Sequence, residues 1–138
     1  MPSPPDLSSP IGQSPARLMA RRAVAGQGRH VDDFTLPRTV EVAYVRSPYA
    51  HADIGKIDKS AAAEQRGVIA VVTGREIAER MTPWTGIMEN QPALKSAPQY
   101  ALAVERAVWQ GEPAVAVIAE TRAIAEDAAE LVLVDWNE

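Results

Sequence analysis

The chain has 138 residues, a formal net charge of −4 and no cysteine. This length fits one domain, and the lack of cysteine excludes disulfides, iron–sulfur clusters and cysteine-ligated zinc within the chain. The acidic balance argues against a nucleic-acid partner. No apolar run approaches the ~20 residues of a membrane span, and no secretory signal opens the sequence, so we predict a cytoplasmic protein with no membrane span.

Charge and proline are distributed unevenly along the chain. Residues 1–30 carry a local balance of +3 and residues 112–138 a balance of −6, which indicates either two solvated faces or two assembly surfaces. Residues 1–15 hold five of the eleven prolines, interleaved with serines, and this composition is typical of a flexible tail. The predicted organisation is a Pro/Ser-rich tail over 1–15 and one domain over 16–138.

The first half of this domain shows two strand patterns, a helical turn and a strongly apolar run. Strands are expected over 40–45, where Val40, Val42 and Tyr44 share one face, and over 52–57. A helical turn over 60–66 follows, with Ser60 as its N-cap. The run 68–73 is apolar on both faces between two glycines, which predicts a buried central strand.

The second half begins with a helix over 75–81 and a long loop over 82–99. This loop carries more apolar residues than a solvated loop needs, which indicates either a buried interface or a fold back onto the core. Further strands are expected over 100–104, 108–109, 114–119 and 131–136, with a helix capped by Thr121 before the last. The fold class is therefore α+β, with a mixed β-sheet and two or three short helices.

Gly26 and Gly28 are the first candidates for a binding motif. They could open a dinucleotide fingerprint, but the third glycine, the preceding strand and the following helix are all missing. Backbone freedom at a tight turn is the favoured interpretation.

The two histidines stand beside aspartates, His30 with Asp32 and Asp33, and His51 with Asp53. Imidazole and carboxylate groups can bind metals or transfer protons. Nothing in the sequence brings the two clusters together, so hydrogen bonding to loop backbone is the favoured role.

Glu112 lies directly before an apolar strand and could serve as a catalytic base, with His51 as a second member of a pocket. The favoured alternative is that Glu112 braces a turn and Pro113 marks the start of the strand. No nucleophile elbow and no phosphate-binding loop are present. The residues alone thus indicate a structural or docking domain more than an independent enzyme.

Five segments in order resemble the N-terminal α/β hammerhead domain of the molybdenum hydroxylase large subunit, the xanthine dehydrogenase, aldehyde oxidase and carbon monoxide dehydrogenase family. The first four look like the family patterns Gly-x-Gly-x-aromatic-x-Asp-Asp, Arg-Ser-Pro-x-Ala-His-Ala, Gly-Val-x-Ala-Val-x-Thr-Gly and Gly-Glu-Pro-Val-Ala. The fifth looks like the helix before the last strand. His30 departs from the pattern by replacing the usual aromatic residue. The segments are residues 26–33, 46–52, 67–74, 111–117 and 125–132.

The resemblance implies a part of a larger redox enzyme. Family members use molybdopterin to hydroxylate a carbon centre or to oxidise carbon monoxide, and electrons leave through iron–sulfur clusters and then FAD. The molybdenum pocket lies in domains that follow the hammerhead, so we assign no catalytic, cofactor-binding or metal residue to this chain and expect it to bind no cofactor alone.

The partners implied by the resemblance are the molybdenum-domain portion of the large subunit and the iron–sulfur subunit, with a flavin subunit as a further candidate. The chain would brace the molybdenum domains and contact the electron-transfer subunits. Two alternatives stay open, an autonomous small α+β enzyme or ligand-binding domain, and an interaction module outside this enzyme class.

Overall fold

The computed structural model describes residues 11–12, 14, 16–87, 90–91 and 93–138. Most of the predicted tail over 1–15 lies outside them, so the tail and its boundary stay predictions. The chain divides into two units, Met1–Pro37 and Arg38–Glu138. The first unit contains the helix α1 (Ala20–Val24) and the short 3-10 turn η1 (Val31–Asp33). The second, called the packed unit below, contains every strand of the described residues.

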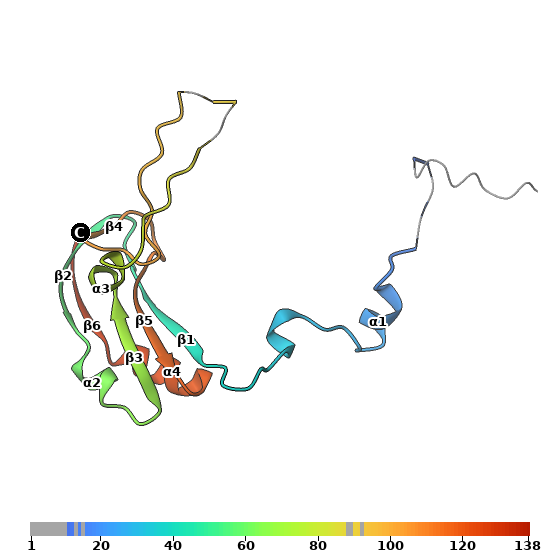
Figure 1. The fold of residues 1–138 in the computed structure, drawn as a ribbon, viewed down its shortest axis with the longest axis horizontal. Coiled ribbons are helices and arrows are strands. Elements are labelled where there is room, and N and C mark those ends of the chain that lie inside the picture. Colours follow the sequence, from blue (N-terminus) through green and yellow to red (C-terminus); the bar gives the residue numbers. More distant parts are fainter. Residues whose placement is uncertain (1–10, 13, 15, 88–89, 92) are drawn as a thin grey trace, which may run out of the picture. The chain divides into compact units, whose positions relative to one another are not determined.

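The strands of the packed unit form two three-stranded sheets, in the orders β1-β5-β3 and β4-β2-β6 (Figure 1). Neighbouring strands within each sheet are antiparallel. The α+β class with short helices is confirmed, and the strands divide into two antiparallel sheets where a single mixed sheet was expected. The strands are β1 (Glu41–Arg46), β2 (Ala52–Asp58), β3 (Val68–Thr73), β4 (Arg106–Ala107), β5 (Pro113–Ala119) and β6 (Leu133–Asn137).

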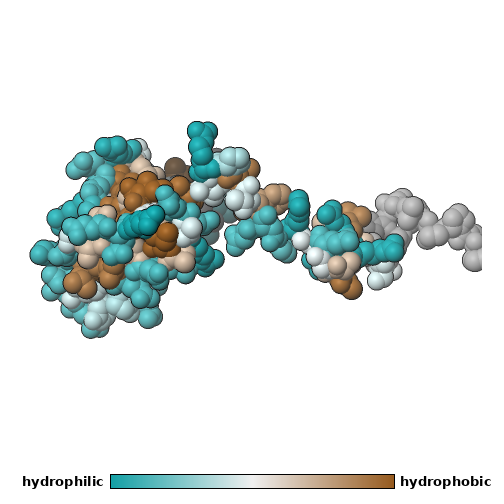
Figure 2. Space-filling view, turned by 90° about the horizontal axis from the view of Figure 1, so that it is seen from below, coloured by the Kyte–Doolittle hydropathy of each residue, from teal (hydrophilic) through white to brown (hydrophobic). Residues whose placement is uncertain are grey.

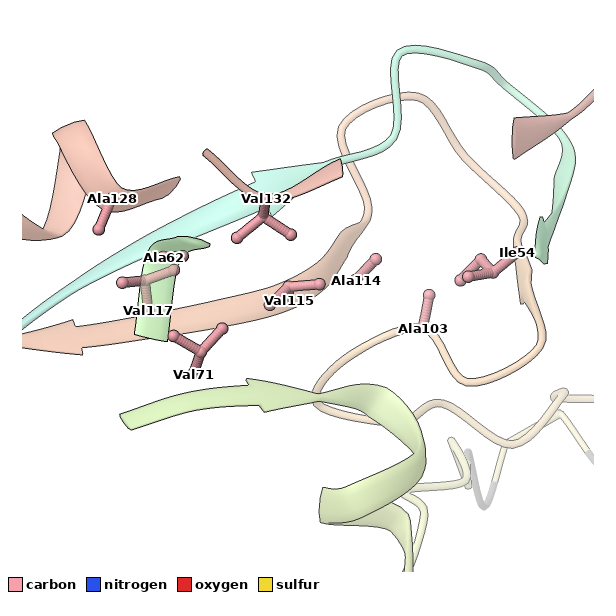
Figure 3. Packing of buried hydrophobic residues seen from close by; sticks show 9 residues of the cluster. All are labelled: Ile54, Ala62, Val71, Ala103, Ala114, Val115, Val117, Ala128 and Val132. Carbon is pink, nitrogen blue, oxygen red and sulfur yellow. The ribbon is translucent and has the colours of Figure 1, made fainter. Parts of the chain in front are cut away.

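Three short helices connect these strands: α2 (Ser60–Ala63), α3 (Gly74–Ala78) and α4 (Arg122–Glu130). The core lies between one face of the β1-β5-β3 sheet, the second sheet and helices α2 and α4 (Figure 3). Alanine lies where these helices meet the strands, since a small side chain lets a helix approach a sheet closely. The cluster consists of Ile54, Ala62, Val71, Ala103, Ala114, Val115, Val117, Ala128 and Val132.

Several expected elements differ from the observed ones. The run 68–73 forms β3 with the predicted bounds, but β3 lies at an edge of its sheet and β5 is central, so the central placement was wrong. No strand forms over 100–104, and the short strand expected at 108–109 is instead β4, two residues earlier. Ser60 is the first residue of α2 and not its N-cap. Its N–H and hydroxyl both donate to Asp58 Oδ1, at 3.1 and 2.6 Å.

The N-cap of α4 is confirmed. Thr121 has extended backbone, and its Oγ1 accepts a hydrogen bond from Ile124 N at 3.3 Å. We expect Thr121→Ala to lower the free energy of unfolding by about 1 kcal/mol, because a helix N–H loses its partner. Urea unfolding measures this loss, and Thr121→Ser, which keeps the hydroxyl, should retain most of the stability. A fully stable alanine variant would show that the cap is dispensable.

An ion pair with two supporting hydrogen bonds joins the start of α2 to the start of α3. Lys59 Nζ lies 2.6 Å from Glu76 Oε1, and Glu76 Oε2 accepts hydrogen bonds from the backbone and hydroxyl of Thr73. The Lys59 ammonium, followed by the Thr73 backbone donor, lowers the pKa of Glu76 from its usual 4.5 to about 2. A carboxyl with a depressed folded-state pKa stabilises the fold above pH ~4.5 and loses that contribution as the pH falls towards 2.

We therefore expect wild-type stability to decline between pH 5 and pH 2, and Glu76→Gln to flatten this decline. The effect should be about 1 kcal/mol or less, since the pair is half exposed to solvent. Thermal unfolding across this pH range measures it, with Glu64→Gln, at an exposed carboxylate, as the matched control. An unchanged slope in Glu76→Gln would refute the assignment.

Candidate functional site

Glu112 braces the turn that leads into β5. It is 6% exposed, its Oε2 accepts a hydrogen bond from Val108 N at 2.6 Å, and its backbone oxygen accepts one from Ser47 N at 2.9 Å. Ser47 O in turn accepts a hydrogen bond from Gly111 N at 2.8 Å. The structure thus confirms the bracing interpretation, and it joins the Ser47 turn to the start of the central strand.

The structure does not unite Glu112 and His51 in one pocket. Glu112 lines a cavity of about 510 Å³, and His51, which is exposed, does not line it. Asp53, beside His51, forms an ion pair with Arg106 across the β2–β4 ladder, with Oδ1 2.5 Å from Nε. The hydrogen bond from Arg106 lowers the pKa of Asp53. The aspartate therefore acts in a structural pair, and the two-residue pocket of the autonomous-enzyme alternative does not form.

The candidates in the first unit also serve local backbone structure. Gly26 has φ +68°, and its N–H donates to Ala23 O at the end of α1, as expected of a glycine at a tight turn. Asp33 Oδ2 accepts a hydrogen bond from His30 N at 2.7 Å across η1. These contacts confirm the turn interpretation of Gly26 and the backbone-bonding interpretation of Asp33.

No metal site is evident in the part of the chain that the structure describes. That part contains no group of three or more histidine, cysteine, aspartate or glutamate residues that could hold a metal ion. Within the same part, no helix has both the length and the apolar character needed to cross a bilayer. The absence of a resident cofactor in this chain remains a prediction.

The most extensive unusual feature is one face of the β1-β5-β3 sheet, which we call the outer face. Cross-strand partners project to the same side of a sheet, and the ladders place Val42 and Ala70 beside Ile118, and Tyr44 and Val72 beside Ala116. The alternate residues of the same strands, such as Val115 and Val117, point into the core. The outer face is defined by Val42, Tyr44, Ala70, Val72, Ala116 and Ile118.

The outer face is apolar and is open to solvent along β1, whereas Ala116 on β5 is only 9% exposed. Val42 is 43% and Tyr44 45% exposed, and Val40 continues the same alternation at 44%. The Arg46 guanidinium lies 5.1 Å from the centre of the Tyr44 ring, a cation–π contact at the border of the face. Figure 2 shows further apolar side chains at the surface of the packed unit among polar ones. Exposed apolar patches are typical of interaction surfaces, so the outer face is a candidate for one.

The loop over 82–99 is a second exposed apolar feature. Trp84 and Gln99 close its base through two reciprocal backbone hydrogen bonds of 2.8 Å, and the loop extends away from both sheets (Figure 1). Trp84, Ile87 and Leu94 are 63%, 85% and 43% exposed. The described part of the loop therefore does not fold back onto the core, which favours the interface interpretation.

Comparison with known proteins agrees with this architecture. The family model described as "Aldehyde oxidase and xanthine dehydrogenase, a/b hammerhead domain" matches residues 25–138. The nicotine 6-hydroxylase large subunit of Paenarthrobacter nicotinovorans is 36% identical over 130 residues, which are 94% of this chain and 16% of that subunit.

Solved structures give the same result. Quinoline 2-oxidoreductase from Pseudomonas putida 86 matches with a TM-score of 0.83 and 36% identity over 94% of this chain and 16% of that one. A Cu,Mo-CO dehydrogenase matches with a TM-score of 0.75 and 34% identity over 92% and 15%. The chain thus spans about a sixth of the length of these relatives. It belongs to the aldehyde oxidase and xanthine dehydrogenase family, as the α/β hammerhead domain of that class of molybdenum enzymes.

Proposed function

We propose that this chain is a non-catalytic hammerhead part of a molybdenum hydroxylase or dehydrogenase, and that its outer face packs against the molybdenum-domain portion of the large subunit. The observation that supports this proposal is the composition and exposure of β3. A strand that is apolar on both faces is typical of burial on both faces, yet in β3 only Val71 is fully buried, Ala70 and Val72 are half-buried and Ile69 is 57% exposed. The second face needs a partner surface to account for its composition.

The proposed partner follows from the relatives. They are about six times as long as this chain, and the parts of them beyond the match have no counterpart in its 138 residues. A surface that a relative of this fold covers with its own remaining domains would be exposed here, which fits the open outer face. In this proposal the molybdopterin, the iron–sulfur clusters and FAD belong to the assembled complex.

The test is purification of the native complex through an affinity tag on this chain. The expected result is co-purification of a molybdenum-domain polypeptide and an iron–sulfur subunit, with molybdenum and iron bound to the complex. Recovery of a lone monomer without either metal would contradict the proposal. Stable partners of another class would instead support the interaction-module alternative. The cytoplasmic location and the absence of a nucleic-acid partner stay predictions.

We propose further that the loop over 82–99 contacts an electron-transfer subunit. Its exposed Trp84 and Ile87 provide apolar contact area away from the outer face, and tryptophan is enriched among residues that dominate binding energies. We expect Trp84→Ser to lower the iron recovered with the tagged chain while molybdenum recovery stays at the wild-type level. Metal analysis of the two purified complexes checks this. Parallel loss of both metals would place Trp84 at the molybdenum-domain contact instead.

A further inference from the structure

The cavity beside Glu112 contains a buried carboxylate with one oxygen unsatisfied by the chain. The cavity lies between the end of the loop over 82–99 and the segment 103–112. Glu112 Oε2 accepts from Val108 N, and no donor among the described residues reaches Oε1. Every fully buried side-chain oxygen in the described residues has a hydrogen-bond partner. Glu112 Oε1 has none among these residues, so it is not fully buried, and it is accessible from the cavity that Glu112 lines.

The remaining charges at the cavity also favour a cation. Glu105 and Arg106 line it together with Glu112. The Arg106 guanidinium binds Asp53 Oδ1 at 2.5 Å through Nε, and within the described residues no hydrogen bond joins it to Glu112. Glu112 is 6% exposed, and only one of its two carboxylate oxygens has a donor in the described part of the chain. A cation in the cavity would therefore gain a charge-assisted hydrogen bond to Oε1.

The walls of the cavity suit a flat cation. Trp109 and Tyr100 line it and are 43% and 41% exposed. Aromatic faces attract cations, and a guanidinium both stacks on such faces and donates several hydrogen bonds in one plane. An ammonium group would satisfy the carboxylate but would gain less from the aromatic walls.

We propose that this cavity binds the guanidinium of an arginine side chain carried by the part of the large subunit outside this chain. The guanidinium donates to Glu112 Oε1, and its apolar face lies against Trp109 and Tyr100. The source of the arginine rests on the proposed function, whereas the guanidinium preference of the cavity rests on this chain alone.

The test is an NMR titration of the full 138-residue chain with N-acetyl-arginine-methylamide. We expect saturable shifts of the Val108 amide and the Trp109 indole N–H, and none with the neutral citrulline analogue. Glu112→Gln keeps an acceptor for Val108 N, so it should fold normally and bind at least about tenfold more weakly, as expected when a buried charge pair loses one charge. Glu120→Gln, at an exposed carboxylate, is the matched control.

Equal shifts with the citrulline analogue, or unchanged affinity in Glu112→Gln, would overturn the guanidinium preference. The source of the arginine is tested by repeating the titration on the assembled complex. Blocked binding supports occupation by a partner arginine, whereas undiminished binding excludes it. Neither result depends on the outer face, so a failure here is distinguishable from a failure of the proposed assembly.

Discussion

Gly74→Ala should prevent stable folding of the packed unit. A β-carbon built at Gly74 lies 1.9 Å from Ala103 O and 2.6 Å from the Ala103 carbonyl carbon. Both are backbone atoms, so no side-chain rotation relieves the clash. Relief would need the buried Leu102–Ala103 segment to move away from the start of α3. Overpacking of this kind costs about 3 kcal/mol or more, which is a large share of the stability of a small domain.

Circular dichroism and urea unfolding of Gly74→Ala measure this effect. Gly28→Ala is the matched control, because a β-carbon there has only His30 Nε2 within 4 Å, at 3.8 Å. The control should have wild-type stability or gain slightly from the reduced freedom of the unfolded chain. A Gly74→Ala protein that unfolds at the wild-type urea concentration would show that the Ala103 backbone does not contact the start of α3 closely enough to exclude a β-carbon.

Val42→Lys should disrupt assembly while leaving the fold intact. Val42 lies on the edge strand β1 of the outer face and is 43% exposed, so a lysine there stays solvated in the free chain. In the assembled enzyme the same lysine would be buried against an apolar surface, and burial of an unpaired charge is costly. We expect molybdenum recovered through the tagged chain to fall about tenfold or more, which corresponds to about 1.4 kcal/mol.

Leu133→Lys is the matched control for this experiment. Leu133 is a 67% exposed apolar residue on a strand of the other sheet, opposite Asp58. It should leave both the melting temperature and the molybdenum recovery unchanged. Equal loss of molybdenum in both variants would mean that added charge weakens assembly in general. It would contradict the proposal that the outer face packs against the molybdenum-domain portion.

Local elements of this fold were predictable because their signals lie within a few residues. The apolar run between Gly67 and Gly74 has the bounds of β3, and Thr121 caps α4 as its position indicated. The shared face of Val42 and Tyr44 follows from strand alternation and is confirmed by their pairing with β5. Glycine at the turn after α1 and glutamate at the turn before β5 likewise have the local roles that their residue types favour.

The arrangement of the strands was not predictable from the same patterns. Both β3 and β5 are apolar on two faces, and periodicity does not show which of the two becomes the central strand. The division into two sheets depends on pairings between distant segments, such as Ala52 with Ala107. The cavity beside Glu112 was not predictable for the same reason. Tyr100 and Trp109 line it together only because the loop over 82–99 returns to the packed unit.

The most direct measurement is the chemical accessibility of Tyr44 in the free chain and in the purified complex. Nitration of tyrosine, read by mass spectrometry, should modify Tyr44 readily in the free chain, where it is 45% exposed. In a complex that retains its molybdenum, we predict strong protection of Tyr44. Modification of Tyr44 to the same extent in the intact complex would contradict the claim that the outer face is the docking surface.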